Sequence, residues 1–340
     1  MAIVTGLPAG LILERDAIDA DLRRRQEGYG RSPRQRIEQD RVEVLAGLRH
    51  GRTLGTPLAL VVQNRDHENW AWGMSAWPPD GEPSGKGTKA VSVPRPGHAD
   101  LAGTLKYGLA DTRDSLERAS ARHTAVAVAA GAVCKALLAT ISVHVEGTVA
   151  TEELERRIDE ARAERDTVGG VVEVRATGVP PGLGSYATKE DRLDARLAAA
   201  LMGIQAVKGV EIGDGFALAE LRGSQAHDEI AEGLRRTSNR AGGIEAGVSN
   251  GEDIVVRAAM KPLPTLMRPL QTVDLDTGQP AEALVERSDV AAVEALAVVA
   301  EAAVAFELAR AAREKFGGDA LGDFVAAWRA YLERIDWASR

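Results

Sequence analysis

His98 stands in the stretch VSVPRPGHADLAG, between a Pro-Gly pair and an Ala-Asp pair. Proline fixes its own backbone angle and pushes the preceding residue toward extended geometry, whereas glycine opens conformations that other residues avoid. Because imidazole titrates near neutral pH, a histidine held in such a turn can act as a general acid or base. A lone histidine in a turn is more often structural than catalytic, so this stretch alone leaves both interpretations open.

Arginine is concentrated near the N-terminus. The stretch LRRRQEGYGRSPRQR contains a group of arginines, namely Arg23, Arg24, Arg25, Arg31, Arg34 and Arg36. The whole chain has a net charge of −8, which argues against a general nucleic-acid binder because affinity for phosphate backbones comes from clustered Lys and Arg. In an acidic chain, a local basic concentration is typical either of a site for a small anion or of an ordinary solvated face.

Two further stretches hold groups that suit anions. ERASARHTA contains Arg118, Ser120 and Arg122 where a helix is expected to begin, and free N–H groups at helix N-termini favour phosphate. MKPLPTLMRPL, stiffened by three prolines, presents Lys261 and Thr265. Each stretch has a plainer alternative: a surface helix start for the first and a rigid connection for the second.

The glycine-rich stretch SNRAGGIEAGVSNGED (238–253) lets backbone approach a ligand or a neighbouring strand closely. It matches neither the dinucleotide fingerprint nor the phosphate loop, and alone it indicates a pair of turns more often than a site. The histidines show no spacing typical of metal ligands, and the single cysteine excludes an intrachain disulfide and a multi-cysteine zinc site. We therefore expect no metal.

Alanine-rich helices followed by short β-branched strands form the expected framework. Helical patterns at 118–140, 152–166 and 191–207 each precede an apolar strand, which predicts an α+β layered architecture with closely packed helices. A long late helix is expected within 283–319, with Ser288 or Asp289 as its N-cap and Gly317-Gly318 as its stop.

We expect one large domain over residues 1–340, in which the Pro- and Gly-rich segment 76–90 forms an exposed loop. No apolar run approaches the ~20 residues that cross a bilayer, and no secretory leader is recognisable. Hydrophobic residues make up 44% and charged residues 27% of the chain, as in globular proteins. A cytoplasmic protein without membrane or nucleic-acid partners is the prediction.

Eight stretches together resemble, in order, the chorismate synthase family, above all its actinobacterial-type, single-function members. The resemblance runs from about residue 6 to 335. The stretches are GYGRSPRQRIEQDRVEVLAGLRHGRTLGTPLALVVQN, RPGHADLAGTLKYG, ERASARHTAVAVAAGAV, LDARLAAALMGIQAVKGVEIGDGF, GSQAHDEI, SNRAGGIEAGVSNGE, AAMKPLPTLMRPL and ERSDVAAVEALAVVAEAAVAFELA.

This resemblance implies a β-α-β sandwich with internal strand–helix repetition, usually a homotetramer. It also implies a lyase of the shikimate pathway that makes chorismate from 5-enolpyruvylshikimate 3-phosphate by 1,4-anti elimination of phosphate and a ring hydrogen. The family needs reduced FMN, although the overall reaction is redox-neutral. No flavin-reductase domain is visible in the sequence, so an external reductant is expected; the sequence does not say whether NADPH is used directly.

The resemblance also assigns roles to residues. Arg25 and Arg31 match residues that bind the anionic substrate or NADP. Because three arginines stand side by side, Arg24 is an alternative to Arg25 for this match. His98 matches the histidine that serves the flavin as a proton donor, and Asp289 matches the aspartate that relieves the flavin of a proton. The positions that match the flavin-contacting set are Arg118, Ala119, Ser120, Gln225, Ala226, Ala246, Lys261, Pro262, Leu263, Pro264, Thr265 and Arg287.

The chain departs from the family in one respect that bears on activity. Family members begin with a strand followed by Gly-Glu-Ser-His-Gly, whose histidine is the proposed acid for the departing phosphate, and this motif does not occur here. Either the start was assigned too late or the motif has been lost, and a missing general acid costs about 10²–10⁴-fold in rate. The alternative function is therefore a non-catalytic or weakened relative that keeps the fold. A smaller departure is Ala246, where the family usually has glycine.

Overall fold

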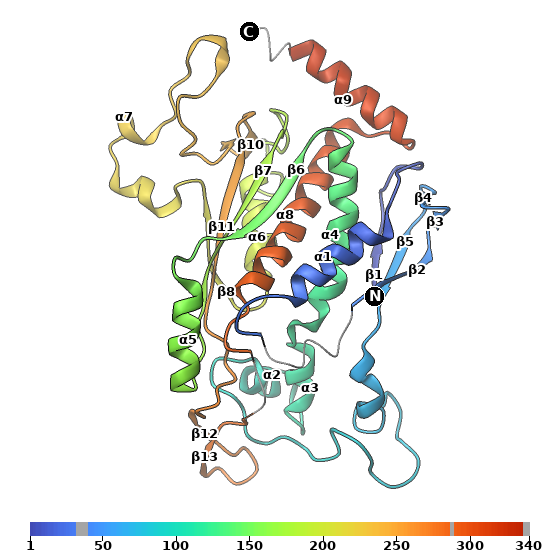
Figure 1. Ribbon diagram of the computed structural model, residues 1–340, viewed down its shortest axis with the longest axis vertical. Coiled ribbons are helices and arrows are strands. Elements are labelled where there is room, and N and C mark those ends of the chain that lie inside the picture. Colours follow the sequence, from blue (N-terminus) through green and yellow to red (C-terminus); the bar gives the residue numbers. More distant parts are fainter. Residues whose placement is uncertain (32–39, 286–288, 336–340) are drawn as a thin grey trace.

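The computed structural model describes residues 1–31, 40–285 and 289–335, and in it a layer of helices lies between two antiparallel sheets (Figure 1). One sheet has the strand order β1-β5-β2, formed by Ala2–Val4, Leu58–Val62 and Val42–Ala46. The other has the order β6-β7-β11-β8, formed by His144–Val149, Gly170–Thr177, Ile254–Met260 and Val207–Ile212. The β-α-β sandwich and the α+β class expected from the sequence are confirmed.

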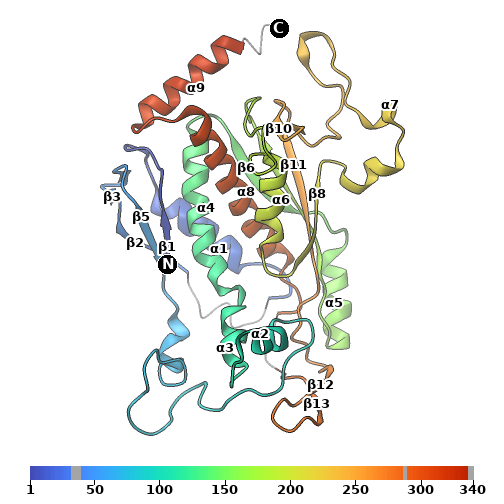
Figure 2. The same ribbon diagram turned by 180° about the vertical axis from the view of Figure 1, so that it is seen from behind.

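The helix layer consists of α1 (Arg15–Gln26), α4 (Thr124–Ala139), α6 (Leu193–Met202) and α8 (Val293–Phe316). Helices α8 and α6 pack on the four-stranded sheet, while α4 packs between α8 and the smaller sheet, as the view from behind also shows (Figure 2). The core of the molecule lies between these three layers.

Small residues allow these layers to approach closely. A Cβ atom added to Gly131 of α4 would lie 2.3 Å from Cβ of Ala302 on α8, so the two helices touch at this point. A Cβ atom on Gly147 of β6 would lie 2.2 Å from the carbonyl oxygen of Ala297. The abundance of alanine therefore serves close packing, as the sequence predicted.

The three predicted helix–strand pairs are present, as α4 with β6, α5 (Leu154–Glu164) with β7, and α6 with β8. The late helix α8 ends at Gly317, whose φ is +61°, as predicted. Its predicted N-cap is wrong: α8 begins at Val293, and Asp289 forms an ion pair with Arg31 instead of capping the helix. Ser288 lies outside the described residues.

Shorter elements surround the sandwich. The helices are α2 (Asp100–Tyr107), α3 (Arg113–Arg118), α7 (Gly223–Ala226), α9 (Leu321–Ile335) and the 3₁₀ turns η2 (Arg65–Trp70), η3 (Ala121–His123), η4 (Gly215–Glu220) and η5 (Glu232–Leu234). The hairpins are β3–β4 (Leu48–Arg49 and Arg52–Thr53), β9–β10 (Ile244–Glu245 and Val248–Ser249) and β12–β13 (Gln271–Val273 and Pro280–Glu282). Residues 76–90 contain no helix or strand, and all except Gly87 are exposed.

One helical stretch in the described residues, Arg113–Ala139, is long and apolar enough to cross a membrane by length and composition alone. Most of it is α4, the core helix that packs against α8 and the smaller sheet. Cys134 lies inside this helix and is buried. Packing within the fold therefore accounts for the alanine, valine and leucine side chains of α4.

Candidate active site

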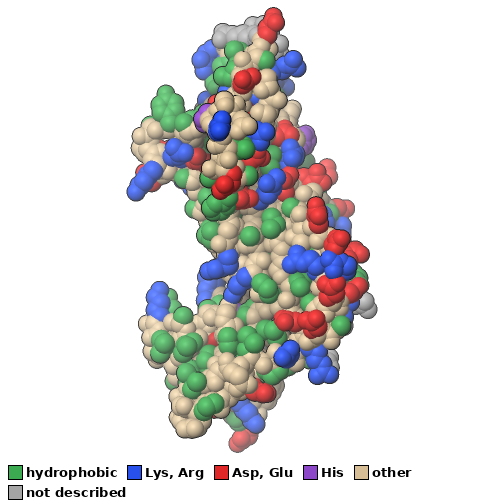
Figure 3. All heavy atoms as spheres, turned by 90° about the vertical axis from the view of Figure 1, so that its left-hand side faces the viewer, with side chains coloured by type: hydrophobic (Ala, Val, Ile, Leu, Met, Phe, Trp, Pro, Cys, Tyr) green, Lys and Arg blue, Asp and Glu red, His purple; other side chains and the backbone are tan. Residues whose placement is uncertain are grey.

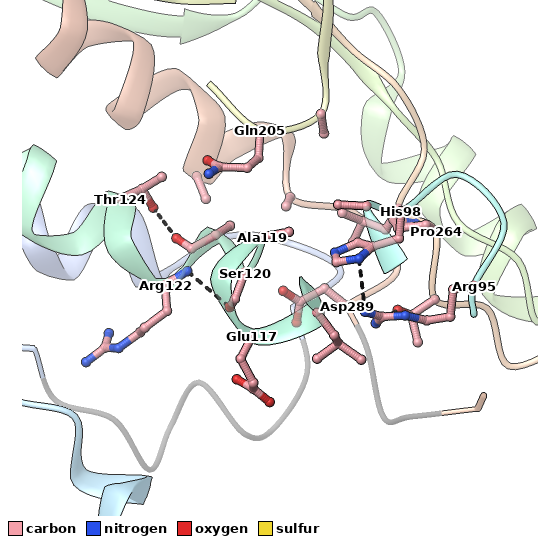
Figure 4. A pocket seen from close by; sticks show the side chains of 18 of the residues that line it. Arg95, His98, Glu117, Ala119, Ser120, Arg122, Thr124, Gln205, Pro264 and Asp289 are labelled. Carbon is pink, nitrogen blue, oxygen red and sulfur yellow. Dashed lines mark hydrogen bonds between the residues drawn. The ribbon is translucent and has the colours of Figure 1, made fainter. Parts of the chain in front are cut away.

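A cavity of about 1380 Å³ opens at the end of the sandwich where α4 and α8 begin and β11 ends (Figure 4). Its walls come from segments far apart in the chain: the last turn of α1, η2, the turn that carries His98, the α3–α4 junction and residues 260–265. The N-termini of two long helices, α4 and α8, face this cavity. Their free N–H groups and dipoles favour anions there.

The cavity wall carries more basic than acidic groups among the described residues. The basic ones are Arg25, Arg31, Arg65, Lys86, Arg95, Arg122 and Lys261, and the acidic ones are Asp66, Glu117 and Asp289. Arginine presents a planar fork that matches carboxylate and phosphate. The site therefore suits a ligand with several negative charges.

Arg24 and Arg25 lie in different surroundings. Arg25 lines the cavity, where its Nε donates to Oγ1 of Thr124 at 2.9 Å and its Nη1 lies 3.4 Å from Oδ2 of Asp40. Arg24 points into the helix layer and forms two hydrogen bonds, of 3.0 and 2.9 Å, with the buried carboxylate of Glu301. Arg25 thus faces the cavity, and Arg24 is part of the framework.

Asp40 joins two of the cavity arginines. Its side chain is buried, and both oxygens accept hydrogen bonds from Nη1 of Arg122, at 2.7 and 2.8 Å. The Nη2 atom of Arg122 also donates to the carbonyl oxygen of Gln63 at 2.9 Å. Because Asp40 contacts both Arg25 and Arg122, it fixes the position of two cations with one buried charge.

Arg31 and Asp289 form an ion pair of 2.8 Å at the cavity wall, between Nη1 and Oδ2. Both side chains are largely shielded from solvent. The Nε atom of Arg31 is buried and has no hydrogen-bond partner among the described residues. One donor of this guanidinium is therefore unused at the edge of the cavity.

His98 lines the same cavity, with its Nδ1 atom 2.5 Å from Oδ1 of Asp100. Asp100 is completely buried, and Arg95 donates to it from both its backbone and its guanidinium. Arg95 also donates to Oγ1 of Thr265 at 2.9 Å, which ties the histidine turn to the segment after β11. The turn thus holds His98 in a defined orientation.

The predicted flavin-contacting positions fall into two groups. Those that line the cavity are Ala119, Ser120, Lys261, Leu263, Pro264 and Thr265. Arg118 and Pro262 adjoin these positions in the chain without lining the cavity. Gln225 and Ala226 in α7, and Ala246 in the β9–β10 turn, do not line it either. Arg287 lies outside the described residues.

Several residues that line the cavity or support its lining were not singled out from the sequence. Asp100 and Arg95 stood in the same motif as His98, and that proximity was the available signal. Asp40 and Gln205 gave no signal, because only the fold brings Asp40 to the cavity arginines and Gln205 to the cavity. Gln205 lies in the loop between α6 and β8, and its buried Oε1 has no hydrogen-bond partner among the described residues.

Comparison with known proteins places the chain in a family. The family model described as chorismate synthase matches residues 1–151 and 148–312. The chain belongs to the chorismate synthase family. The chorismate synthases of Desulforudis audaxviator and Moorella thermoacetica are each 51% identical to it; both alignments cover 98% of this chain, and 94% and 96% of the respective relatives. That of Rubrobacter xylanophilus is 49% identical over 100% of this chain and 95% of its own length.

A solved structure titled as a chorismate synthase crystal structure matches with a TM-score of 0.76 and 36% identity, covering 98% of this chain and 93% of the other. The chorismate synthase family consists of lyases of the shikimate pathway, so the fold, the family and the enzyme class expected from the motifs are confirmed. Nothing in these comparisons favours the non-catalytic alternative.

Proposed function

We propose that this chain converts 5-enolpyruvylshikimate 3-phosphate to chorismate with the help of reduced FMN. The observation that carries the proposal is the single cavity that gathers His98, Asp289, Arg25 and Arg31 from three separate segments. Figure 4 shows His98, Asp289, Ser120 and Gln205 around this space. Two proton-transfer groups among fixed cations are what an elimination of phosphate from an anionic substrate requires.

The substrate carries two carboxylates and a phosphate, and Arg25, Arg31 and Arg122 are the groups we assign to them. Arg25 and Arg122 are held by Asp40, so the positions of both guanidiniums are set before the substrate arrives. A prepositioned cation loses little conformational entropy on binding. The same fixed charges stabilise the phosphate group as it departs.

Arg31 has a second task in this scheme. It forms a 2.8 Å ion pair with Asp289. An anionic substrate group that draws Arg31 toward itself would weaken this ion pair, which favours transfer of a proton to Asp289.

The residues present fit a bound flavin. The buried Nε of Arg31 and Oε1 of Gln205 offer an unused donor and an unused acceptor at the cavity wall, and the ring and phosphate of FMN carry groups of both kinds. Ala119, Ser120, Lys261 and residues 263–265 would hold the cofactor. Reduced FMN, when bound, supplies electron density for the departure of phosphate and accepts the hydrogen; an external reductant is expected to keep it reduced.

Gln225 and Ala226 reach a flavin in this scheme from a neighbouring copy. They lie on an arm, defined here as residues 213–240, that extends away from the four-stranded sheet (Figure 1), and Figure 3 shows the surface hollowed below it with Lys and Arg side chains inside. Phe216 on this arm is 79% exposed. A homotetramer, as the family implies, would cover this apolar side chain and bring the arm to another cavity.

The test of the reaction is anaerobic incubation of the full chain with reduced FMN and 5-enolpyruvylshikimate 3-phosphate, followed by chorismate absorbance. Product is expected with reduced but not with oxidised FMN. The H98Q variant should lose about 10²–10⁴-fold in turnover while its melting temperature stays unchanged. A folded protein that binds reduced FMN but forms no chorismate would refute the proposal.

The arm has a test of its own. Mixing two defective variants, H98Q and Q225A, should restore part of the activity if one copy supplies the arm and another supplies the histidine. Separate copies with independent sites would show no recovery after mixing. We expect the reaction to take place in the cytoplasm.

A further inference from the structure

The carboxylate of Asp100 has hydrogen-bond partners on both oxygens. Oδ2 accepts from the backbone N–H of Arg95 at 3.0 Å and from its Nε at 2.9 Å. Oδ1 accepts from Nη2 of Arg95 at 3.3 Å and lies 2.5 Å from Nδ1 of His98. Asp100 also occupies the first position of α2, where the helix N-terminus favours a negative charge.

Asp100 is ionised in this setting. Its complete burial opposes ionisation, but the hydrogen bonds from His98 and Arg95 outweigh burial and hold the pKa of Asp100 well below its usual range. An ionised carboxylate only accepts hydrogen bonds. The 2.5 Å contact with His98 therefore places a proton on Nδ1 of the imidazole.

The alternative is a neutral ring with its proton on Nε2 and a bare Nδ1. A bare Nδ1 could accept a hydrogen bond from Arg95 Nη2, which lies 3.2 Å away. Its lone pair would, however, face a lone pair of Asp100 Oδ1 at 2.5 Å, and this repulsion excludes the alternative. With Nδ1 protonated, Nε2 carries the lone pair of the neutral ring, and it has no hydrogen-bond partner among the described residues.

We propose that Asp100 is the positioning residue for His98, fixing the ring so that Nε2 is the nitrogen that meets the ligand in the cavity. Arg95 holds Asp100 in place, and Thr265 holds Arg95. Asp100 itself does not line the cavity. Its catalytic consequence rests on the proposed function, whereas the position of the proton does not.

An Asp100→Asn substitution makes a sharp prediction. Two donors from Arg95 require an oxygen at the Oδ2 position, so the amide NH₂ group of the asparagine must occupy the Oδ1 position and face Nδ1. Nδ1 then becomes the acceptor, and the proton of the neutral ring moves to Nε2. With the neutral ring protonated on Nε2, His98 has no lone pair toward the cavity with which to take up the proton that it must donate there, so turnover should fall at least about tenfold.

The measurement is the ring ¹⁵N spectrum of the histidines at a pH where they are neutral, recorded on the full chain without flavin or substrate. The H98Q variant assigns the signals of His98 among the six histidines. We expect Nδ1–H in the wild type and Nε2–H in D100N. A wild-type ring protonated on Nε2, or an unchanged tautomer in D100N, overturns the proposal, and the wild-type spectrum alone suffices if D100N does not fold.

Asp111 offers a matched control. Its Oδ1 accepts from the backbone N–H groups of Val91 and Arg113, at 2.8 and 2.9 Å, and it does not line the cavity. D111N should leave the tautomer of His98 unchanged. A move of the ring proton from Nδ1 to Nε2 in D111N would overturn the specific role of Asp100.

A double variant separates positioning from a general structural effect. In the H98Q background, D100N should cause no further loss of turnover, because its effect passes through His98. An additional loss of tenfold there would overturn the proposal. Failure of the wild type to form chorismate would refute the proposed function and leave the tautomer result standing.

Discussion

Glu301 is the residue whose replacement tests the packing argument most directly. It lies on α8 with an almost fully buried side chain, and four donors surround its two oxygens. Oε1 accepts from Arg24 Nη1 at 3.0 Å and Lys135 Nζ at 2.5 Å, and Oε2 accepts from Arg24 Nη2 and the Gly147 backbone, both at 2.9 Å. This carboxylate therefore joins α1, α4 and β6 to α8.

The E301Q variant keeps the shape and removes the charge. Whichever way the amide turns, its NH₂ group faces two donors, so two hydrogen bonds are lost. Arg24 can turn toward solvent, since its side chain is 40% exposed, and Lys135 keeps Asp21 at 2.5 Å. The loss is thus at the lower end of the 3–5 kcal/mol expected for breaking a buried pair, about 3 kcal/mol.

Urea unfolding at pH 7 measures this loss, with E314Q on the same helix as the control. Glu314 also pairs with two arginines, Arg196 and Arg310, but its side chain is 50% exposed, so its replacement should cost less than about 1 kcal/mol. Equal losses in the two variants would refute the argument that burial makes the Glu301 cluster stabilising.

The pH dependence of stability gives a second check on the role of Glu301. Burial raises the pKa of Glu301, but the hydrogen bonds and charges of Arg24 and Lys135 prevail, so its pKa lies below the ordinary value of 4.5. The stability it contributes is complete above about pH 4.5 and is lost as the pH falls through the folded-state pKa. The difference between wild type and E301Q should therefore narrow in acid, and a difference that widens would contradict the assignment.

Three further predictions concern single positions. Ala246 has a φ of +52° in the two-residue β9–β10 turn, so A246G should stabilise the chain by about 0.5–1 kcal/mol in thermal unfolding, and a lower melting temperature would contradict this strain. R25Q should weaken substrate binding, whereas R24Q should lower stability and leave substrate binding nearly unchanged; calorimetric titration measures the first effect and urea unfolding the second. Burial raises the pKa of the Cys134 thiol to about 12, so it should react with a thiol reagent at pH 8 only when the chain is unfolded, and rapid labelling of the native protein would show the site to be open.

The sequence by itself determined the central helices and the family. The alanine-rich periodicity of 118–140 and 191–207 fixed α4 and α6, because a helical stripe of small side chains has few other ways to be buried. Glycine at 317 fixed the end of α8, since glycine adopts a positive φ, here +61°, at little cost. The ordered motifs fixed the family, with His98 and Asp289 among its matching positions.

Tertiary structure alone decided which of these residues meet. Arg24 and Arg25 are identical in type and adjacent in the chain, and only the packing of α1 against α8 turns one toward Glu301 and the other toward the cavity. Aspartate is a common helix N-cap residue, yet Asp289 forms an ion pair with Arg31, which is far from it in the sequence. Gln225 and Ala226 match the family pattern but do not line the cavity of their own chain. Local sequence sets backbone preferences, whereas contacts between distant segments depend on how the layers pack.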